Sequence, residues 1–175
     1  MAGEYTTRVN QALAFAKALN TQAAQEQQAS ILAKACLEGA CLQLHIAYNF
    51  YLREIASQYS LPVLTHSSAE ELQTIFAEQG RICPEVTELC EIHSRSGSWL
   101  SCLKDAHQRI LDPGGPAPSS SVAAHSSTLN KDRDHSLVIG VVEVDIQVLS
   151  TGNVKEWLGS ISTLITRHRE SMQEC

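Results

Sequence analysis

The stretch that decides the fold is residues 37–59, LEGACLQLHIAYNFYLREIASQY. Its apolar residues follow one another every three or four positions, which is the spacing of one face of an α-helix. Four further apolar residues widen this stripe toward a second side: Ile31, Ala35, Leu42 and Ile46. We therefore expect one long helix over residues 27–59, roughly 50 Å long at 1.5 Å per residue. It ends before Pro62, because the residue that precedes a proline avoids the α conformation.

Gly39 lies in the middle of this helix, where glycine costs about 1 kcal/mol relative to alanine. Its presence indicates either close packing against a neighbouring helix or no special role.

Helical patterns recur on both sides of the long helix. A first helix is expected over residues 4–20, with a possible extension to 24. A capping box, Ser68 to Glu71, predicts a short helix over 69–79 that Gly80 closes. Three more helices are expected to begin at the following residues: Pro84, Ser98 (as the cap) and Asn153. The fold class is thus mainly α, a bundle of about five to six helices with a long second helix.

Two segments depart from the helical pattern. Residues 113–135 are rich in Pro, Gly and Ser and end in a charged run, which predicts a flexible insert. Residues 137–149 alternate β-branched and polar side chains, which predicts one isolated strand. Such a strand needs a partner for its backbone groups, either residues 61–65 or a second copy of the chain, unless it lies extended along the helices. We interpret residues 1–175 as a single helical domain that contains this insert.

Charge and composition narrow the classes of partner. The net charge of −6 makes nucleic acid an unlikely partner, since phosphate binding needs an excess of Lys and Arg. The most apolar stretch, residues 29–52, carries Lys34, Glu38 and His45, so it does not read as a membrane-spanning helix. No secretory signal is visible, and the six cysteines are therefore expected to be reduced thiols in a cytoplasmic protein.

The usual chemical motifs of helical proteins are not found. No histidine follows a glutamate at the spacing of di-iron sites, and the zinc-protease and phosphate-loop motifs are missing. Three glutamates lie three positions apart, Glu85, Glu88 and Glu91. We interpret them as a solvated acidic edge of a helix rather than as a cation site. A thiol hydrolase uses Cys, His and Asn, and these residue types occur at Cys41, His45 and Asn49. They lie one turn apart in a straight row on a single helix, so their side chains would not point toward one substrate atom. We expect no catalytic residue, no metal site and no cofactor.

A polar row on the long helix supplies the binding candidates. Glu38, His45, Asn49 and Arg53 share one side of the helix with Lys34. If this row is solvated, it is the outer face of the helix; if another helix covers it, it forms a buried polar network. Two residues of the first helix could meet it, and the candidate set is therefore Arg8, Asn10, Glu38, His45, Asn49 and Arg53.

Several local patterns resemble a bacterial family of small, uncharacterised helical proteins. They are Tyr5-Thr6-x-Arg8-x-Asn10-Gln11, Tyr59-Ser-Leu-Pro62, Ser98-Trp99-Leu100 and Arg167-x-Arg169-Glu170-x-Met172. The resemblance implies a bacterial, cytoplasmic protein and carries no assigned activity.

The leading hypothesis is a non-enzymatic helical bundle that acts through protein–protein contacts, with an unknown protein or with a second copy of itself. The lone strand, the two-sided apolar stripe of the long helix and the lack of catalytic motifs favour it. The alternative is a helical-bundle enzyme or small-ligand binder that uses the polar row.

Overall fold

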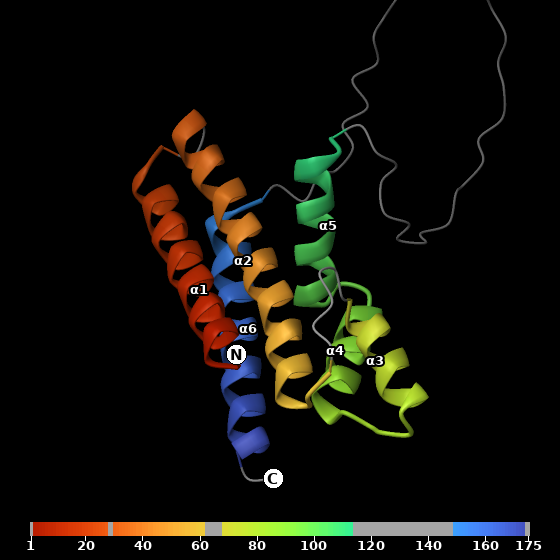
Figure 1. Cartoon of the computed structure of the whole chain (residues 1–175). Helices are drawn as coiled ribbons and strands as arrows, with labels where there is room; N and C mark the ends of the chain where they lie inside the picture. The colour runs from red at the N-terminus through yellow and green to blue at the C-terminus, as the bar shows by residue number, and fades with distance from the viewer. Residues whose placement is uncertain (1, 28–29, 62–67, 114–148, 174–175) are drawn as a thin grey trace, which may run out of the picture.

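The computed structural model describes residues 2–27, 30–61, 68–113 and 149–173 (Figure 1). These residues form six α-helices, in agreement with the predicted class. The helices are α1 (Ala2–Gln25), α2 (Ile31–Gln58), α3 (Ala69–Glu78), α4 (Pro84–Ser94), α5 (Trp99–Leu111) and α6 (Thr151–Gln173).

The helices α1 and α2 form an antiparallel hairpin (Figure 1). Small residues at the crossing let the two backbones approach, and Ala16 and Ala40 are fully buried there. A Cβ atom on Gly39 would lie 3.2 Å from Cδ1 of Leu19, which is closer than most real contacts. This approach confirms the close-packing reading of Gly39.

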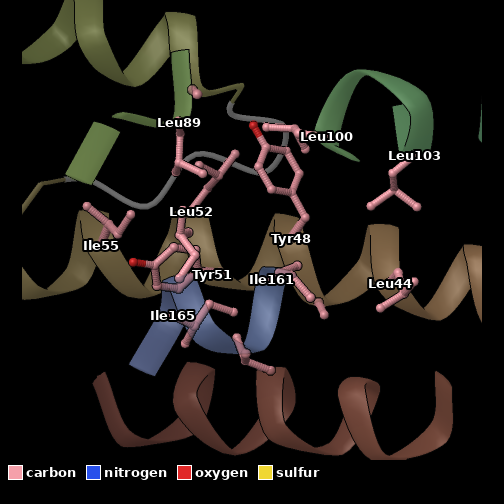
Figure 2. Packing of buried hydrophobic residues seen from close by; sticks show 14 of the residues in the cluster. Leu44, Tyr48, Tyr51, Leu52, Ile55, Leu89, Leu100, Leu103, Ile161 and Ile165 are labelled. Carbon is pink, nitrogen blue, oxygen red and sulfur yellow. The ribbon is translucent and has the colours of Figure 1, made fainter. Parts of the chain in front are cut away.

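The third long helix, α6, lies behind the hairpin and packs against both α1 and α2 (Figure 1). The shorter helices α3, α4 and α5 cover the other side of α2, which makes α2 the central element. Its buried face carries Leu44, Tyr51 and Ile55, which pack with Ile161 and Ile165 of α6 (Figure 2). The apolar stripe predicted from the sequence is therefore the centre of the core.

Serine caps define most of the helix starts. The capping box of α3 is present, with the Ser68 hydroxyl accepting from Glu71 N–H and the Glu71 carboxylate accepting from Ser68 N–H. Ser30 caps α2 and Ser98 caps α5. Gly80, with φ of 65°, follows the end of α3, where a left-handed conformation favours glycine.

Several predicted boundaries need correction. The last helix does not start at Asn153 but at Thr151, because the Ser150 hydroxyl accepts a hydrogen bond of 3.2 Å from Asn153 N–H. The first helix runs to Gln25, through the Gln/Ala-rich stretch, so the longer of its two predicted ends is the right one. Helix ends depend on local hydrogen bonds that apolar spacing does not reveal.

The predicted strand is not borne out in the part of the chain that the structure describes. No strand occurs among those residues, and Leu149, the last residue of the predicted strand at 137–149, lies in an irregular segment before α6. The rest of that strand and nearly all of the predicted insert at 113–135 lie outside the described residues. Among the helices that are described, none has the length and apolar character that crossing a membrane requires.

Candidate functional site

The six predicted site residues do not meet in one place. Four of them lie on α2 and face different neighbours along its length, and the other two, Arg8 and Asn10, lie on α1. Glu38 pairs with Lys34 at 4.0 Å on the surface, and Asn49 is exposed. The other four are divided between the outer face of the hairpin, the α2–α5 interface and the contact of α1 with α6.

Arg8 and Arg53 come together on the outer face of the hairpin. Their guanidinium carbons lie 5.9 and 5.2 Å from the ring centroid of Phe50, and Tyr5 packs beside the same ring at 6.4 Å. Cation–π contacts of this kind contribute on the order of 0.5–1 kcal/mol at exposed positions. This cluster holds the start of α1 against the second half of α2.

His45 instead faces α5. Its ring lies 3.5 Å from that of His107 between centroids, and its Nδ1 atom is buried without a hydrogen-bond partner. Burial lowers the pKa of His45 to about 4, with further lowering by the charges of His107 and Lys104. The imidazole is therefore neutral at pH 7.

Cys41 lies one turn before His45, so the thiol-hydrolase interpretation can be examined directly. Cys41 is fully buried, and burial raises the pKa of its thiol to about 12. A nucleophilic cysteine needs a thiolate and access to its substrate, and Cys41 has neither at neutral pH. The structure thus favours a packing role for this residue.

Asn10, itself exposed, joins a partly buried polar network that sequence reasoning did not foresee. Arg169 of α6 donates two hydrogen bonds, of 2.7 and 2.8 Å, to the carboxylate of Glu54 in α2, and a third of 3.0 Å to the amide oxygen of Asn10 in α1. Glu54 is only 1% exposed. This two-pronged pairing joins the three long helices at one end of the bundle.

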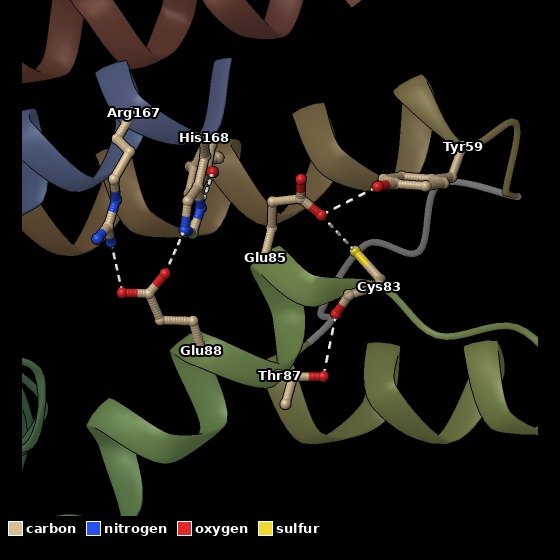
Figure 3. A network of polar contacts seen from close by, with 8 residues as sticks. Tyr59, Cys83, Glu85, Thr87, Glu88, Arg167 and His168 are labelled. Atoms are coloured by element: carbon tan, nitrogen blue, oxygen red, sulfur yellow. Dashed lines mark hydrogen bonds and ion pairs between the residues drawn. The ribbon is translucent and has the colours of Figure 1, made fainter. Parts of the chain in front are cut away.

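A second chain of hydrogen bonds joins α2, α6 and α4 (Figure 3). The Tyr51 hydroxyl lies 2.6 Å from Nδ1 of His168, and Nε2 of the same ring lies 2.9 Å from Glu88. Arg167 also donates to Glu88. Hydrogen bonds from His168 and Arg167 outweigh the effect of burial, so that the pKa of Glu88 falls below its ordinary value.

The Tyr51–His168–Glu88 chain has the composition of an acid–base relay, but its position argues for another role. Tyr51 is fully buried and His168 is 4% exposed. Burial, with the nearby charges of Glu54 and Glu85, raises the pKa of Tyr51 above its ordinary value. A general base must reach a substrate proton; Tyr51 and His168 are enclosed, and only Glu88, whose side chain is 36% exposed, reaches the surface. The network therefore fastens α6 to the core.

Glu85 forms a third buried group at the start of α4. It accepts hydrogen bonds from the Tyr59 hydroxyl at 2.9 Å and from the Cys83 thiol at 3.1 Å (Figure 3). The predicted solvated acidic edge at Glu85, Glu88 and Glu91 is thus wrong for Glu85, which is buried, whereas the side chain of Glu88 is 36% exposed and bonds to Arg167 and His168. Helical spacing alone could not reveal these partners, since they come from distant parts of the sequence.

Two open hollows adjoin the outer side of α4 and α6. One of about 710 Å³ is lined by Ile92, Trp99, Leu164 and Arg167, among others, and one of about 890 Å³ shares Trp99 with it. None of the six predicted residues lines either hollow. In the described part of the chain, no group of three or more His, Cys, Asp or Glu side chains is placed to hold a metal ion.

Among the described residues, four of the six exposed large apolar side chains lie on the α1–α2 hairpin: Phe15, Ile31, Leu32 and Ile46. The other two, Ile82 and Leu111, lie elsewhere. Phe15 is 49% exposed, Leu32 51% and Ile46 39%. Leu19 packs against Gly39, so Phe15, one turn earlier on α1, lies level with Leu42, one turn later on the antiparallel α2. We call this surface the hairpin strip; it consists of Phe15, Leu32, Ala35, Gly39, Leu42 and Ile46.

Comparison with known proteins identifies a family for the whole chain. A family model described as "Family of unknown function (DUF6586)" matches residues 1–175, and the chain therefore belongs to this family. The match agrees with the resemblance to an uncharacterised helical family. Neither the curated proteins nor the solved structures give a match.

Proposed function

We propose that this member of the DUF6586 family is a non-enzymatic, cytoplasmic helical-bundle protein, folded as one domain, that acts through protein–protein contacts made by the hairpin strip. The observation that carries the proposal is the exposure of Phe15 on α1 and of Leu32 and Ile46 on α2, along the outer face of the hairpin. Contiguous exposed apolar surface is uncommon on monomeric proteins and marks contact sites.

The same stripe that predicts the long helix explains why the strip exists. Helix α2 is apolar on two sides: α3, α5 and α6 pack against one of them, and α1, the main neighbour of α2, leaves part of the other exposed. Ala35, Leu42 and Ile46 belong to the other side, where polar residues would otherwise be expected for a helix at a protein surface. An apolar face of this kind gains free energy when a partner removes it from water, about 25 cal/mol per Å² of apolar area.

The burial of the reactive groups supports a non-enzymatic role. Tyr51, His168 and Glu54 are almost inaccessible, and each is satisfied by hydrogen bonds within the protein. The five described cysteines are free thiols, which fits a reducing compartment. The alternative, a ligand site on the polar row, is disfavoured because Asn10, Glu38 and His45 face three separate surroundings.

Affinity capture with matched charge insertions tests the proposal. Ile46→Glu puts a charge at an exposed apolar residue of the strip, and Ile82→Glu puts the same charge at a residue that is 85% exposed near α4. A charge in a desolvated contact costs on the order of 2 kcal/mol or more, which is about a 30-fold loss of affinity. We expect Ile46→Glu to lose the proteins that the native chain captures, a second copy included, and Ile82→Glu to keep them.

The native chain and both variants should give the same circular dichroism spectrum, so that folding does not confound the comparison. Unchanged capture by Ile46→Glu, or a native chain that captures neither itself nor another protein, would overturn the proposed function.

A further inference from the structure

We propose that the cleft between α1 and α6 binds a small phosphate ester. Lys17 and Lys155 hold its phosphate, and Leu13 and Leu158 lie against the apolar group that the ester carries. The cleft shares no residue with the hairpin strip, so the inference goes beyond the contact role proposed above. Shape, charge, hydrogen-bonding groups and one open glycine carry it.

The cleft has the size of a small-molecule site. Helices α1 and α6 lie side by side and antiparallel (Figure 1), and the cleft between them has a volume of about 530 Å³. Small-molecule sites occupy about 300–1,000 Å³ and combine apolar walls with a few polar groups. Leu13 and Leu158, both partly buried, supply apolar walls here.

Both charged residues that line the cleft are positive. Lys17 comes from α1 and Lys155 from α6, and the lining contains no aspartate or glutamate. Neither lysine forms an ion pair with another described residue. Lys155 also borders a hollow beside α4, but Glu156, the acidic residue next to it in the sequence, lines only the hollows on that side. Because the chain as a whole has a net charge of −6, two unpaired positive charges in one cleft indicate an anionic ligand rather than a generally basic surface.

Uncharged polar groups line the same cleft. The Oδ1 atom of Asn20 is buried and has no hydrogen-bond partner among the described residues. A buried polar atom without a partner is costly, so free energy is gained when the amide turns toward a ligand and forms hydrogen bonds. The Asn20 amide nitrogen and the Ser162 hydroxyl can both donate to an anionic oxygen. The cleft therefore offers hydrogen-bond donors as well as positive charge.

The type of basic residue favours a phosphate over a carboxylate. Lysine binds phosphate as a point charge, whereas two-pronged pairing with a carboxylate is a property of arginine. A phosphate monoester carries a charge of about −1.5 to −2 at pH 7, which two lysines match, and a carboxylate carries about −1.

Gly159 keeps the α6 side of the cleft open. It lies inside α6, where glycine destabilises a helix relative to alanine. A Cβ atom there would meet no side chain of the described residues within 4 Å, in contrast to Gly39, where Leu19 is close. Close packing within the chain thus explains Gly39 but not Gly159, whereas a ligand that lies against the α6 backbone explains it.

An NMR titration of the isotope-labelled full chain with phenyl phosphate tests the site. We expect the backbone amides of Lys17, Asn20, Lys155 and Gly159 to shift together and to saturate with a dissociation constant of about 1 mM or lower. Benzoate, which has the same ring and less charge, should bind at least about threefold more weakly, and uncharged phenol should give no saturable shift. Amides of the cleft that do not shift at up to about 20 mM phenyl phosphate, or benzoate that binds as tightly, would overturn the proposal.

Lysine variants separate the cleft from the surface at large. Lys17→Gln and Lys155→Gln should each raise the dissociation constant at least about threefold, because each removes one charge next to the phosphate. Lys34→Gln is the matched control, since this lysine is 80% exposed on α2 and lies outside the cleft. It should change the constant less than about twofold, because salt screens distant charges.

Gly159→Leu tests the space itself. Because a Cβ atom at this position has no close neighbour among the described residues, the variant should keep the native circular dichroism spectrum. Its side chain occupies the cleft, so phenyl phosphate should bind at least about tenfold more weakly. Equal affinity of the native chain, both cleft lysine variants and Gly159→Leu would place the ligand elsewhere and overturn the proposal. The hairpin strip is intact in all of these variants, so their capture of partner proteins reports on the proposed function separately.

Discussion

The Arg169 guanidinium meets the Glu54 carboxylate through two hydrogen bonds of 2.7 and 2.8 Å, and Glu54 is 1% exposed. Removing one partner leaves the other charge buried and unpaired, which costs about 3–5 kcal/mol. We therefore expect Arg169→Met to lower the free energy of unfolding by this amount. Urea denaturation followed by circular dichroism measures it.

The neighbouring Arg167 provides the control, because its side chain is 60% exposed and its partner Glu88 also pairs with His168. Arg167→Met should cost no more than about 1 kcal/mol, as exposed ion pairs do. The double variant Glu54→Leu, Arg169→Leu removes both charges and should recover part of the loss. If Arg167→Met and Arg169→Met lower the free energy of unfolding equally, the burial of Glu54 does not set the contribution of the Glu54–Arg169 pair to stability.

The buried polar contacts show which features of the site the sequence alone could not predict. Apolar spacing predicts α2 because its apolar side chains repeat at the helical period, and it places His168 on the inner face of α6. It cannot predict that Tyr51 and Glu88 bond to that histidine, since these partners are 117 and 80 positions away. Glu54 offers no local sign of burial either, because its partner Arg169 comes from another element.

For the polar row on α2, helical spacing does not predict which neighbouring helix each residue contacts. The spacing of its residues places them on one side of α2. In the structure they have different neighbours, because α1, α5 and α6 each pack against α2. Asn10 and Arg8, predicted to join the row from α1, turn to Arg169 and to Phe50 respectively. Ser150, rather than Asn153, caps α6, because its hydroxyl accepts a hydrogen bond from the Asn153 backbone amide.

At the scale of elements, the packing of α5 on α2 is expected to depend on pH. His45 and His107 face one another across this interface, and burial lowers the pKa of both. The unfolded chain protonates His45 below about pH 6.5, whereas the folded chain resists protonation down to about pH 4. The contribution to stability is therefore complete above pH 6.5 and is lost as the pH falls toward 4.

The variant His45→Gln isolates this effect from carboxylates that titrate in the same range, because only one group changes. After allowance for partial exposure of the ring, the native chain should lose about 2 kcal/mol more than the variant between pH 7 and pH 4. Urea denaturation at a series of pH values gives the two slopes. If the free energy of unfolding falls equally with pH in the native chain and in His45→Gln, His45 does not make the α2–α5 interface sensitive to pH.

At the scale of the whole molecule, the bundle is expected to open in parts. Helix α2 contributes twelve buried residues and contacts α1, α3, α5 and α6, whereas α3 contributes only Ala69, Leu72 and Phe76 and packs mainly on α4. Elements with few buried contacts open at lower free energy than the core. Native-state hydrogen exchange should therefore show the α3 amides exchanging through local openings, and those of α2 around Leu44–Ile55 only through global unfolding.

This difference matters for a contact role, because the hairpin strip lies on the most stable part of the molecule. A surface carried by α1 and α2 stays formed while α3 opens, so a partner meets a rigid face and little ordering entropy is lost on binding. Denaturant added below the unfolding transition should change the exchange rate of the α3 amides little, because local opening of α3 exposes little surface. The exchange rates of the α2 and α6 amides should rise together, because these amides exchange through global unfolding. Exchange from α2 as fast as that from α3 would contradict this picture and the pre-formed strip that it supports.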